Sequence, residues 1–285
     1  MSPVILIGTH RSGTTWLGQV LSGHPGLAYW VEPRYVWSWG NNYKPDDVLT
    51  KINATPRIIN HIRQRFHKFV KDQGKKRLLE KTPSNCLRLS FIRAVYPEAK
   101  ILHIIRDGRS VFNSAQEILN TGYYPQELLN RRLLEMLLET PISEVPTHVP
   151  RIAEILKSKL TGRPFNLWGP RPQGWREWIK QDPPNVILAK QWAATINQAI
   201  NDGALIDSNL YYRFYYEEMM ARPREIMSNI IDFAELSDAD NLINYVESTV
   251  DPSRQNKWRK LLNQATLEEI RPYMESTLNQ LGYEW

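Results

Sequence analysis

The sequence predicts a single α/β domain built on a doubly wound parallel sheet that is flanked by helices. Short apolar runs, of the kind buried on both faces of a parallel sheet, occur at 3–8, 100–105 and 209–216. Segments with helical periodicity fill much of the chain between them, and this alternation favours right-handed crossovers. The length of 285 residues suits one such domain, so we expect 1–285 to form one unit.

The expected helices are marked by apolar residues three and four positions apart. They cover 14–22, 57–72, 84–95, 109–120, 125–138, 186–203, 223–235 and 266–281. We find no internal repeat, low-complexity tract or Gly/Ser linker, which argues against a second domain. Ligands of doubly wound sheets bind beyond the carboxyl ends of the strands, so loops 8–14 and 106–109 are the expected binding region.

The segment 140–185 has poor periodicity because eight prolines interrupt it, and it contributes three tryptophans. A long irregular segment inside a compact domain is more often a lid or binding loop than filler. We therefore expect an acceptor-binding insertion here. An ordered surface excursion that buries its own tryptophans is the equally open alternative.

The composition favours an anionic ligand. The chain has 36 Lys plus Arg against 30 Asp plus Glu, a net charge of +6. This excess does not choose among nucleic acid, acidic glycans, phospholipid surfaces and small phosphorylated molecules. No apolar run approaches the roughly 18 residues of a membrane span, and no signal peptide is recognised. Together with a single cysteine, Cys86, this predicts a cytoplasmic protein in which that thiol is a small buried hydrophobe.

A phosphate-binding loop is predicted directly after the first strand. Residues 8–15 read Gly-Thr-His-Arg-Ser-Gly-Thr-Thr and run into an amphipathic helix. In this arrangement, backbone N–H groups and the helix N-terminus converge on a phosphate-like anion. The spacing matches the pattern G-x-x-x-x-G-K-[ST] except that Thr14 stands where the lysine that reaches a triphosphate would be. The only cation of the loop is Arg11, so the loop suits a different phosphate-type anion. A plain tight turn is the alternative.

Arg106 and Ser114 predict a second anion site, at the end of the strand 100–105. A kinase or triphosphate hydrolase usually carries a magnesium-binding aspartate there, whereas this strand ends in Arg106. Ser114 follows eight residues later, one helical turn past Ser110, and can point back toward Arg106. Asp107 is the expected N-cap of this helix.

Together these residues resemble the sulfotransferases that use 3′-phosphoadenosine 5′-phosphosulfate (PAPS). Arg11 to Thr15 is similar to the family's 5′-phosphosulfate loop, and Arg106 with Ser114 to its 3′-phosphate site. Weaker matches keep the family's order, namely Glu80-Lys81-Thr82-Pro83, Tyr216-Glu217-Glu218-Met219, Asn256-Lys257-Trp258 and Leu281-Gly282-Tyr283. The resemblance covers about 3 to 283 and is weakest at 35–75 and 120–180. His10 and Gly108 depart from the pattern, since many members have proline at both positions.

The resemblance implies in-line transfer of a sulfuryl group from PAPS to an acceptor hydroxyl or amine, which leaves adenosine 3′,5′-bisphosphate (PAP). The 5′ end would be held by Arg11 and the N–H groups of Ser12, Gly13, Thr14 and Thr15. The 3′ phosphate would be held by Arg106, Ser114 and Lys257. Tyr216 would line or stack on the adenine, although an aromatic residue that ends a strand could equally belong to the core.

Two residues are the candidates for catalysis. The resemblance implies that Lys81 neutralises or protonates the leaving oxygen; a solvated lysine is the alternative. The family's cytosolic branch has a histidine base shortly after this lysine, which this chain lacks. In the tyrosylprotein and some bacterial branches the base is a glutamate shortly after a His-Pro pair at the end of the first helix. Glu32, which follows His24-Pro25, resembles that glutamate. A glutamate between Trp30 and Tyr35 would be partly desolvated, which raises its pKa toward the range of a general base. An ion pair with Arg34 or another nearby arginine is the alternative.

The acceptor class stays open at this stage. Aromatic residues between 29 and 43, together with 140–185, would form its pocket, and aromatic faces suit sugars, phenols and lipid chains. We expect a small-molecule, lipid or carbohydrate acceptor and no nucleic acid or integral membrane association. The basic residues between 57 and 77 could guide an anionic acceptor, but a solvated helix face is the favoured interpretation. The sequence does not indicate an oligomeric state.

No metal is expected, because the six histidines show no metal-binding spacing and one cysteine cannot anchor a zinc cluster. Two other functions remain open. A kinase-like phosphotransferase could use the glycine loop, but Thr14 and Arg106 disfavour it. A non-catalytic polyanion-binding module would explain the net charge, though it would not need two anion sites.

Overall fold

The computed structural model describes residues 2–121, 169–237 and 239–285. Within them, five strands form one parallel sheet in the order β2-β3-β1-β4-β5. The strands are β1 (Val4–Ile7), β2 (Leu27–Val31), β3 (Arg77–Lys81), β4 (Lys100–Ile105) and β5 (Tyr211–Tyr215). This confirms the predicted fold class. The predicted helix 125–138 and residues 140–168 of the insertion lie outside the described residues.

The three strands predicted from apolar runs are β1, β4 and β5, while β2 and β3 were not predicted. Strand β3 reads Arg-Leu-Leu-Glu-Lys, yet all five of its residues are buried. Its charged groups are paired inside the fold: Arg77 donates to the carbonyl groups of Ser2 and Ala234, and Lys81 donates to Glu32. A buried charge is tolerated when it is hydrogen-bonded, so hydropathy alone does not reveal this strand.

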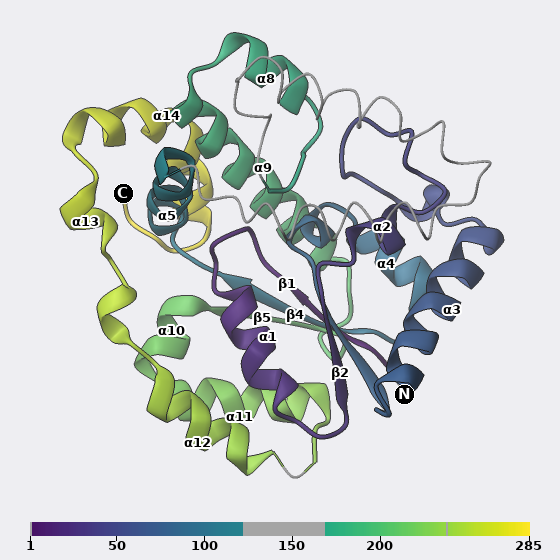
Figure 1. Ribbon diagram of the computed structural model, residues 1–285. Helices are drawn as coiled ribbons and strands as arrows, with labels where there is room; N and C mark the ends of the chain where they lie inside the picture. Colours follow the sequence, from purple (N-terminus) through teal and green to yellow (C-terminus); the bar gives the residue numbers. More distant parts are fainter. Residues whose placement is uncertain (1, 122–168, 238) are drawn as a thin grey trace.

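Helices cover both faces of the sheet (Figure 1). One face carries α1 (Thr14–Ser22), α10 (Tyr216–Ala221), α11 (Pro223–Ala234) and α12 (Asp240–Thr249). The other carries α2 (Arg34–Ser38), η1 (Lys51–Asn53), α3 (Pro56–Asp72), η2 (Pro83–Leu87), α4 (Leu89–Val95) and part of α9 (Pro184–Gly203). A hydrophobic cluster fills the space on each face.

A third hydrophobic cluster lies among the helices beyond the carboxyl edge of the sheet. They are α5 (Gly108–Thr121), α13 (Trp258–Leu261) and α14 (Gln264–Gln280), with α9 between them. The remaining elements are α8 (Trp175–Gln181), which contacts α9, and η4 (Pro252–Arg254). Here α8 shows that the predicted irregular segment contains a helix. The predicted helix 84–95 is interrupted at Arg88, which separates η2 from α4.

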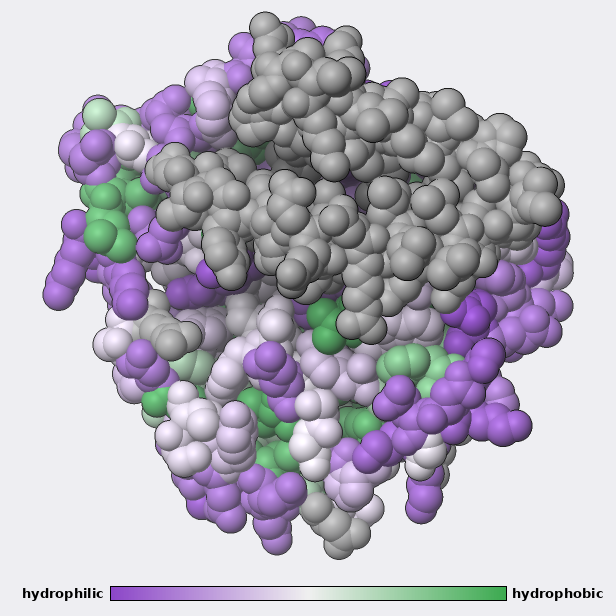
Figure 2. All heavy atoms as spheres, viewed as in Figure 1, coloured by the Kyte–Doolittle hydropathy of each residue, from purple (hydrophilic) through white to green (hydrophobic). Residues whose placement is uncertain are grey.

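The described surface in Figure 2 is hydrophilic over much of its rim, with smaller hydrophobic clusters between. Cys86 is buried in the cluster beneath α3 and α4, as expected. In the described ranges, no helix combines the length and the apolar character that a membrane span needs.

Candidate functional site

The candidate site lies at the carboxyl edge of the sheet, where the loops after the strands meet. The register places Leu6 of β1 opposite Lys81 of β3 and Leu102 of β4, so these strands end at similar levels. Val31 of β2 also lies opposite Lys81, and Glu32 follows it directly. The predicted residues that follow strands therefore share one edge, as is usual in doubly wound sheets.

The loop between β1 and α1 presents a helix N-terminus. Gly13 precedes the helix with φ 93°, a left-handed conformation that favours glycine, and a Cβ there would lie 2.8 Å from the Tyr216 ring. The first helical hydrogen bond joins the Leu17 N–H to the Gly13 carbonyl at 3.0 Å. The preceding N–H groups, including those of Thr14 and Thr15, have no helical partner and can bind an anion.

Ser12 is the predicted loop residue that does not face the cavity. Its side chain is buried, and its hydroxyl donates to the Thr9 carbonyl at 2.5 Å. Its N–H points at the same carbonyl at 3.3 Å. Ser12 therefore holds the turn of the loop from within.

Strained backbone borders the site. Among the described non-glycine residues with positive φ are Arg11 at 64°, Glu32 at 54° and Asn256 at 54°. Such conformations cost about 1 kcal/mol each, and they persist where surrounding contacts fix them, often at functional sites. Asn256 directly precedes Lys257, so each of these three positions is a predicted site residue or adjoins one.

Arg11, Arg106 and Ser114 form one hydrogen-bonded network. The Arg11 Nε donates to the Ser114 Oγ at 2.8 Å, and the Arg106 Nη1 donates to the Arg11 carbonyl at 2.9 Å. Ser114 thus turns back from α5 as expected, and Asp107 caps this helix by accepting from the Arg109 N–H at 2.8 Å. Burial and then the charge of Arg106 lower the pKa of Arg11. Two cations held this close make an attractive site for an anion.

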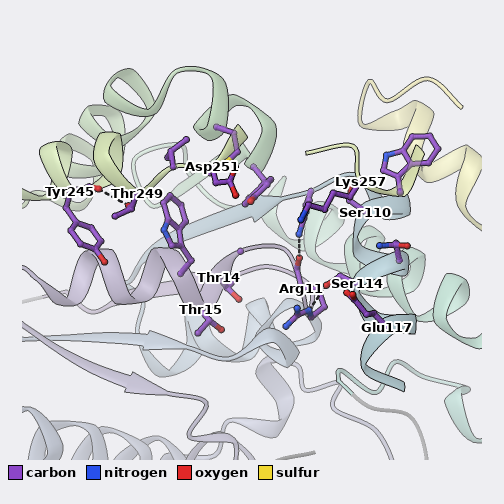
Figure 3. A pocket seen from close by; sticks show the side chains of 18 residues that line it. Arg11, Thr14, Thr15, Ser110, Ser114, Glu117, Tyr245, Thr249, Asp251 and Lys257 are labelled. Atoms are coloured by element: carbon purple, nitrogen blue, oxygen red, sulfur yellow. Dashed lines mark hydrogen bonds between the residues drawn. The ribbon is translucent and has the colours of Figure 1, made fainter. Parts of the chain in front are cut away.

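A cavity of about 580 Å³ opens over this network, and eight of the nine predicted cofactor residues line it. They are Arg11, Gly13, Thr14, Thr15, Arg106, Ser114, Tyr216 and Lys257. Figure 3 shows Arg11, Ser114 and Glu117 grouped together, with Lys257 and Ser110 near them and Tyr245 and Thr249 farther along. The cavity therefore brings residues from four separate parts of the chain to one anion-binding surface.

Tyr216 belongs to the hydrophobic core and also borders the cavity. Its side chain is only 6% exposed and belongs to the hydrophobic cluster under α1, yet it lines the cavity. The Arg106 guanidinium lies 4.4 Å from the centre of its ring, which supports this cation from below by a cation–π contact. Its role toward an adenine stays a prediction.

Sequence reasoning missed part of the lining. Along α5, Ser110, Asn113 and Glu117 join Ser114 in a stripe at helical spacing, a signal that polar periodicity could have given. The remaining wall comes from Trp16, Met220, Tyr245, Thr249, Val250, Asp251 and Trp258. No local pattern marks the residues at the end of α12, because only the tertiary fold brings them to the cavity.

Glu32 and Lys81 meet beside this cavity as an ion pair. The Lys81 Nζ donates to the Glu32 Oε1 at 2.8 Å and to the Thr15 Oγ1 at 3.1 Å. The Lys81 side chain is 1% exposed and that of Glu32 is 18% exposed, so Lys81 is no solvated lysine. Arg34, the partner considered from the sequence, is more distant at 3.9 Å. Thr15 connects the pair with the cavity because it also lines the latter.

A second carboxylate, that of Glu80, directly precedes Lys81 in β3, so its side chain points to the opposite face of the sheet. Glu80 is fully buried and accepts from the Thr82 hydroxyl at 2.5 Å and from the Asn85 amide at 2.7 Å. Burial raises its pKa to about 7, against smaller opposing effects that include the Thr82 hydrogen bond and the charge of Arg88. These bonds join β3 to η2, so Glu80 stabilises the turn that follows Lys81.

The two departures from the family pattern have structural reasons. A Cβ at Gly108 would lie 2.6 Å from the Trp192 and Met274 side chains, which leaves no space for a proline ring. His10 is 5% exposed, and burial together with Arg11 and Arg34 lowers its pKa to about 3. A neutral buried imidazole at this position adds no charge to the loop.

Across the part of the chain that the structure describes, no group of three or more His, Cys, Asp or Glu side chains could hold a metal ion.

Comparison with known proteins connects this site with one family. Residues 3–139 match the model of the sulfotransferase family. Protein-tyrosine sulfotransferase A of Caenorhabditis elegans is 30% identical over 135 residues, which cover 43% of this chain and 36% of the relative. Human protein-tyrosine sulfotransferase 1 is 28% identical over 123 residues, covering 39% of this chain and 33% of the relative. The matched part is thus about a third of the length of these curated relatives.

Solved structures share the fold over nearly the whole chain. A sulfotransferase domain from the curacin biosynthetic pathway has a TM-score of 0.57 at 14% identity, covering 99% of this chain and 98% of that one. The sulfotransferase domain of the Synechococcus olefin synthase also scores 0.57, at 15% identity, with 100% and 96% covered. A mouse sulfotransferase complexed with PAP scores 0.50 at 11% identity, with 97% and 84% covered.

Proposed function

We propose that this chain transfers a sulfuryl group from PAPS to an acceptor hydroxyl, on the premise that residues 3–139 match the model of the sulfotransferase family. The observation that carries the proposal is the cavity, in which three cations and a helix N-terminus face one enclosed space. Its cations, Arg11, Arg106 and Lys257, suit a nucleotide that carries two anionic groups, as PAPS does. The mouse sulfotransferase complexed with PAP supports the choice of nucleotide.

The described residues fit this nucleotide. The N-terminus of α1 and Arg11 would hold the 5′ end, because unbonded N–H groups and a cation both favour phosphate oxygens. Arg106, Ser114 and Lys257 would hold the 3′ phosphate. Trp16 and Tyr245, two aromatic residues of the cavity wall, offer ring faces for the adenine.

PAPS supplies the sulfuryl group, which passes to the acceptor by in-line displacement. The 5′ phosphate of PAP is the leaving group. Lys81 stabilises the charge that develops on the leaving oxygen, and Thr15, bound to its Nζ, positions it next to the phosphate loop. Glu32 accepts the proton of the acceptor hydroxyl through a carboxylate that is 18% exposed. Since the Lys81 Nζ lies 2.8 Å from the Glu32 Oε1, the proposed acid and the proposed base would be hydrogen-bonded to each other.

The proposed acceptor is a small molecule, lipid or carbohydrate with a hydroxyl group, and the relatives named as tyrosine sulfotransferases add a tyrosine phenol to the candidates. The Arg34 Nη1 donates to the Gly169 carbonyl at 3.5 Å, so the described part of the segment 140–185 reaches the turn that carries Glu32. This contact supports the prediction that the segment borders the acceptor. A cytoplasmic location and a reaction without a metal belong to the same proposal, which assigns the neutralising charge to protein cations.

Transfer of a radiolabelled sulfuryl group from PAPS to a panel of sugars, phenols, glycolipids and tyrosine peptides tests this function. We expect label in at least one class of acceptor, and much less with Lys81→Met at equal protein concentration. Label transfer that is equal for wild type and Lys81→Met would contradict the assigned site.

A further inference from the structure

We propose that Arg109, a cation outside the cavity wall, positions the two residues Arg106 and Lys257 for recognition of the 3′ phosphate of the nucleotide. This inference rests on the proposed function. Arg109 is a positioning residue here, because its side chain is buried at 3% exposure and does not line the cavity. It acts through its neighbours.

Arg109 is held along one edge by a carboxylate and contacts two indole rings. Its Nε and Nη2 donate to the two carboxylate oxygens of Asp107 at 3.0 and 2.8 Å, a bidentate pair with defined geometry. The guanidinium also lies 4.1 Å from the ring centre of Trp258 and 5.6 Å from that of Trp285. Buried cation–π contacts of this kind stabilise a planar cation strongly.

The partners of Arg109 adjoin the phosphate-binding cations in sequence. Asp107 follows Arg106 directly, and Trp258 follows Lys257 directly. Lys257 is exposed, and Asn256 before it has strained backbone at φ 54°, whereas Trp258 is buried. The packing of Trp258 against Arg109 therefore determines where the neighbouring Lys257 side chain enters the cavity.

A second set of contacts joins the same turn to the end of the chain. The Asp107 N–H donates to the Glu217 Oε1 at 3.1 Å, and the Tyr283 hydroxyl donates to the Glu217 Oε2 at 2.6 Å. Glu217 follows Tyr216, whose ring supports Arg106. Tyr283 and Trp285 thus bring the segment after α14 against the turn that carries Arg106.

The Arg109–Asp107 pair is electrically neutral, so Arg109→Met leaves the Asp107 carboxylate uncompensated beside Arg106. It also frees Asp107, Trp258 and Trp285 from one another, and Arg109→Lys separates the two effects because it keeps the charge. The affinity contributed by the 3′ phosphate would fall, while the N–H groups at the start of α1, which hold the 5′ end, would keep their contacts.

Calorimetric titration of PAP and of AMP, which lacks the 3′ phosphate, tests this inference. For Arg109→Met we expect PAP affinity to fall about 10-fold or more, with AMP affinity within about threefold of wild type. Arg109→Lys should lose nearly as much, because an ammonium cannot make the bidentate pair. The matched control is Arg259→Met, since Arg259 is exposed and lies 4.8 Å from the same Trp258 ring. It should leave both affinities unchanged.

Thermal unfolding checks that each variant is folded, and Trp285→Ala serves as a second variant if Arg109→Met does not fold. It should lose PAP affinity about threefold to tenfold and keep that of AMP. Equal losses for PAP and AMP, or an unchanged ratio of the two affinities in a folded variant, would overturn the inference and leave the proposed function intact. A wild-type chain that does not prefer PAP to AMP would overturn both.

Discussion

Glu32→Gln removes one negative charge from the Glu32–Lys81 pair and almost nothing else. Glutamine has nearly the same volume, and its Oε1 can still accept from the Lys81 Nζ, which lies 2.8 Å from the Glu32 Oε1 in the wild-type chain. The φ of 54° at this position is unchanged by the substitution, so backbone strain is equal in both proteins. Any difference in activity or stability therefore reports the carboxylate.

Two magnitudes follow from the structure. A general base contributes about 10²- to 10⁴-fold to a reaction, so turnover should fall by at least about 100-fold. Removing one partner of a buried ion pair costs about 3–5 kcal/mol of unfolding free energy. Because Glu32 is 18% exposed and the amide keeps a hydrogen bond, we expect a smaller loss, roughly 2–3 kcal/mol.

The assay is steady-state sulfuryl transfer, with calorimetric titration of PAP and thermal unfolding as companion measurements. PAP affinity should stay within about twofold, since Glu32 lies outside the cavity lining. Glu235→Gln is a closely matched control: Glu235 also has positive φ, at 53°, and also pairs with a strand lysine, Lys100, at 2.7 Å. It is 66% exposed and belongs to the opposite edge of the sheet. Turnover of Glu32→Gln within threefold of wild type, or an equal loss in Glu235→Gln, would refute the assignment of the base.

Three further predictions concern the loop, the buried carboxylate and the second anion site. Gly13→Ala should lower unfolding free energy by about 1–2 kcal/mol and weaken PAP binding, because φ is 93° and the new Cβ would lie 2.8 Å from Tyr216; Gly74→Ala, with φ 62° and no atom within 4 Å of its Cβ, should lose stability alone. Glu80 has a pKa raised from 4.5 to about 7, so the folded protein holds its proton more tightly and loses roughly 3 kcal/mol of stability as pH rises from 4.5 to 7; Glu80→Gln should lack that slope in denaturant unfolding, and parallel pH profiles would contradict it. Arg106→Ala should reduce PAP affinity about 10- to 100-fold in calorimetry and AMP affinity much less, whereas equal losses would place the 3′ phosphate elsewhere.

How far the sequence predicts the fold depends on where each strand finds its hydrogen-bond partners. The strands β1 and β4 are continuous apolar runs, and local hydropathy identifies them. Strand β3 carries Arg77, Glu80 and Lys81 in buried positions, and their partners come from distant segments. Nothing within the five residues of β3 indicates that its charges will be paired.

The same distinction applies to the site. The phosphate loop and the spacing from Arg106 to Ser114 are local, so the sequence predicts both. The hydrogen bond from Arg11 to Ser114 joins residues 103 positions apart, and the wall formed by Tyr245 and Thr249 arrives from α12. The sequence indicated Glu32 and Lys81 separately, but their pairing follows from the register of β2 beside β3. Long-range packing creates these contacts, and no local spacing encodes them.

Titration of the wild-type chain with PAP and, in parallel, with Mg-ATP tests most directly whether the cavity binds the two anionic ends of one sulfotransferase nucleotide. We predict saturable one-to-one binding of PAP that EDTA leaves unchanged, and binding of Mg-ATP that is at least about 100-fold weaker, because Thr14 stands where a triphosphate-binding lysine would be. Tight binding of Mg-ATP without binding of PAP would contradict the account.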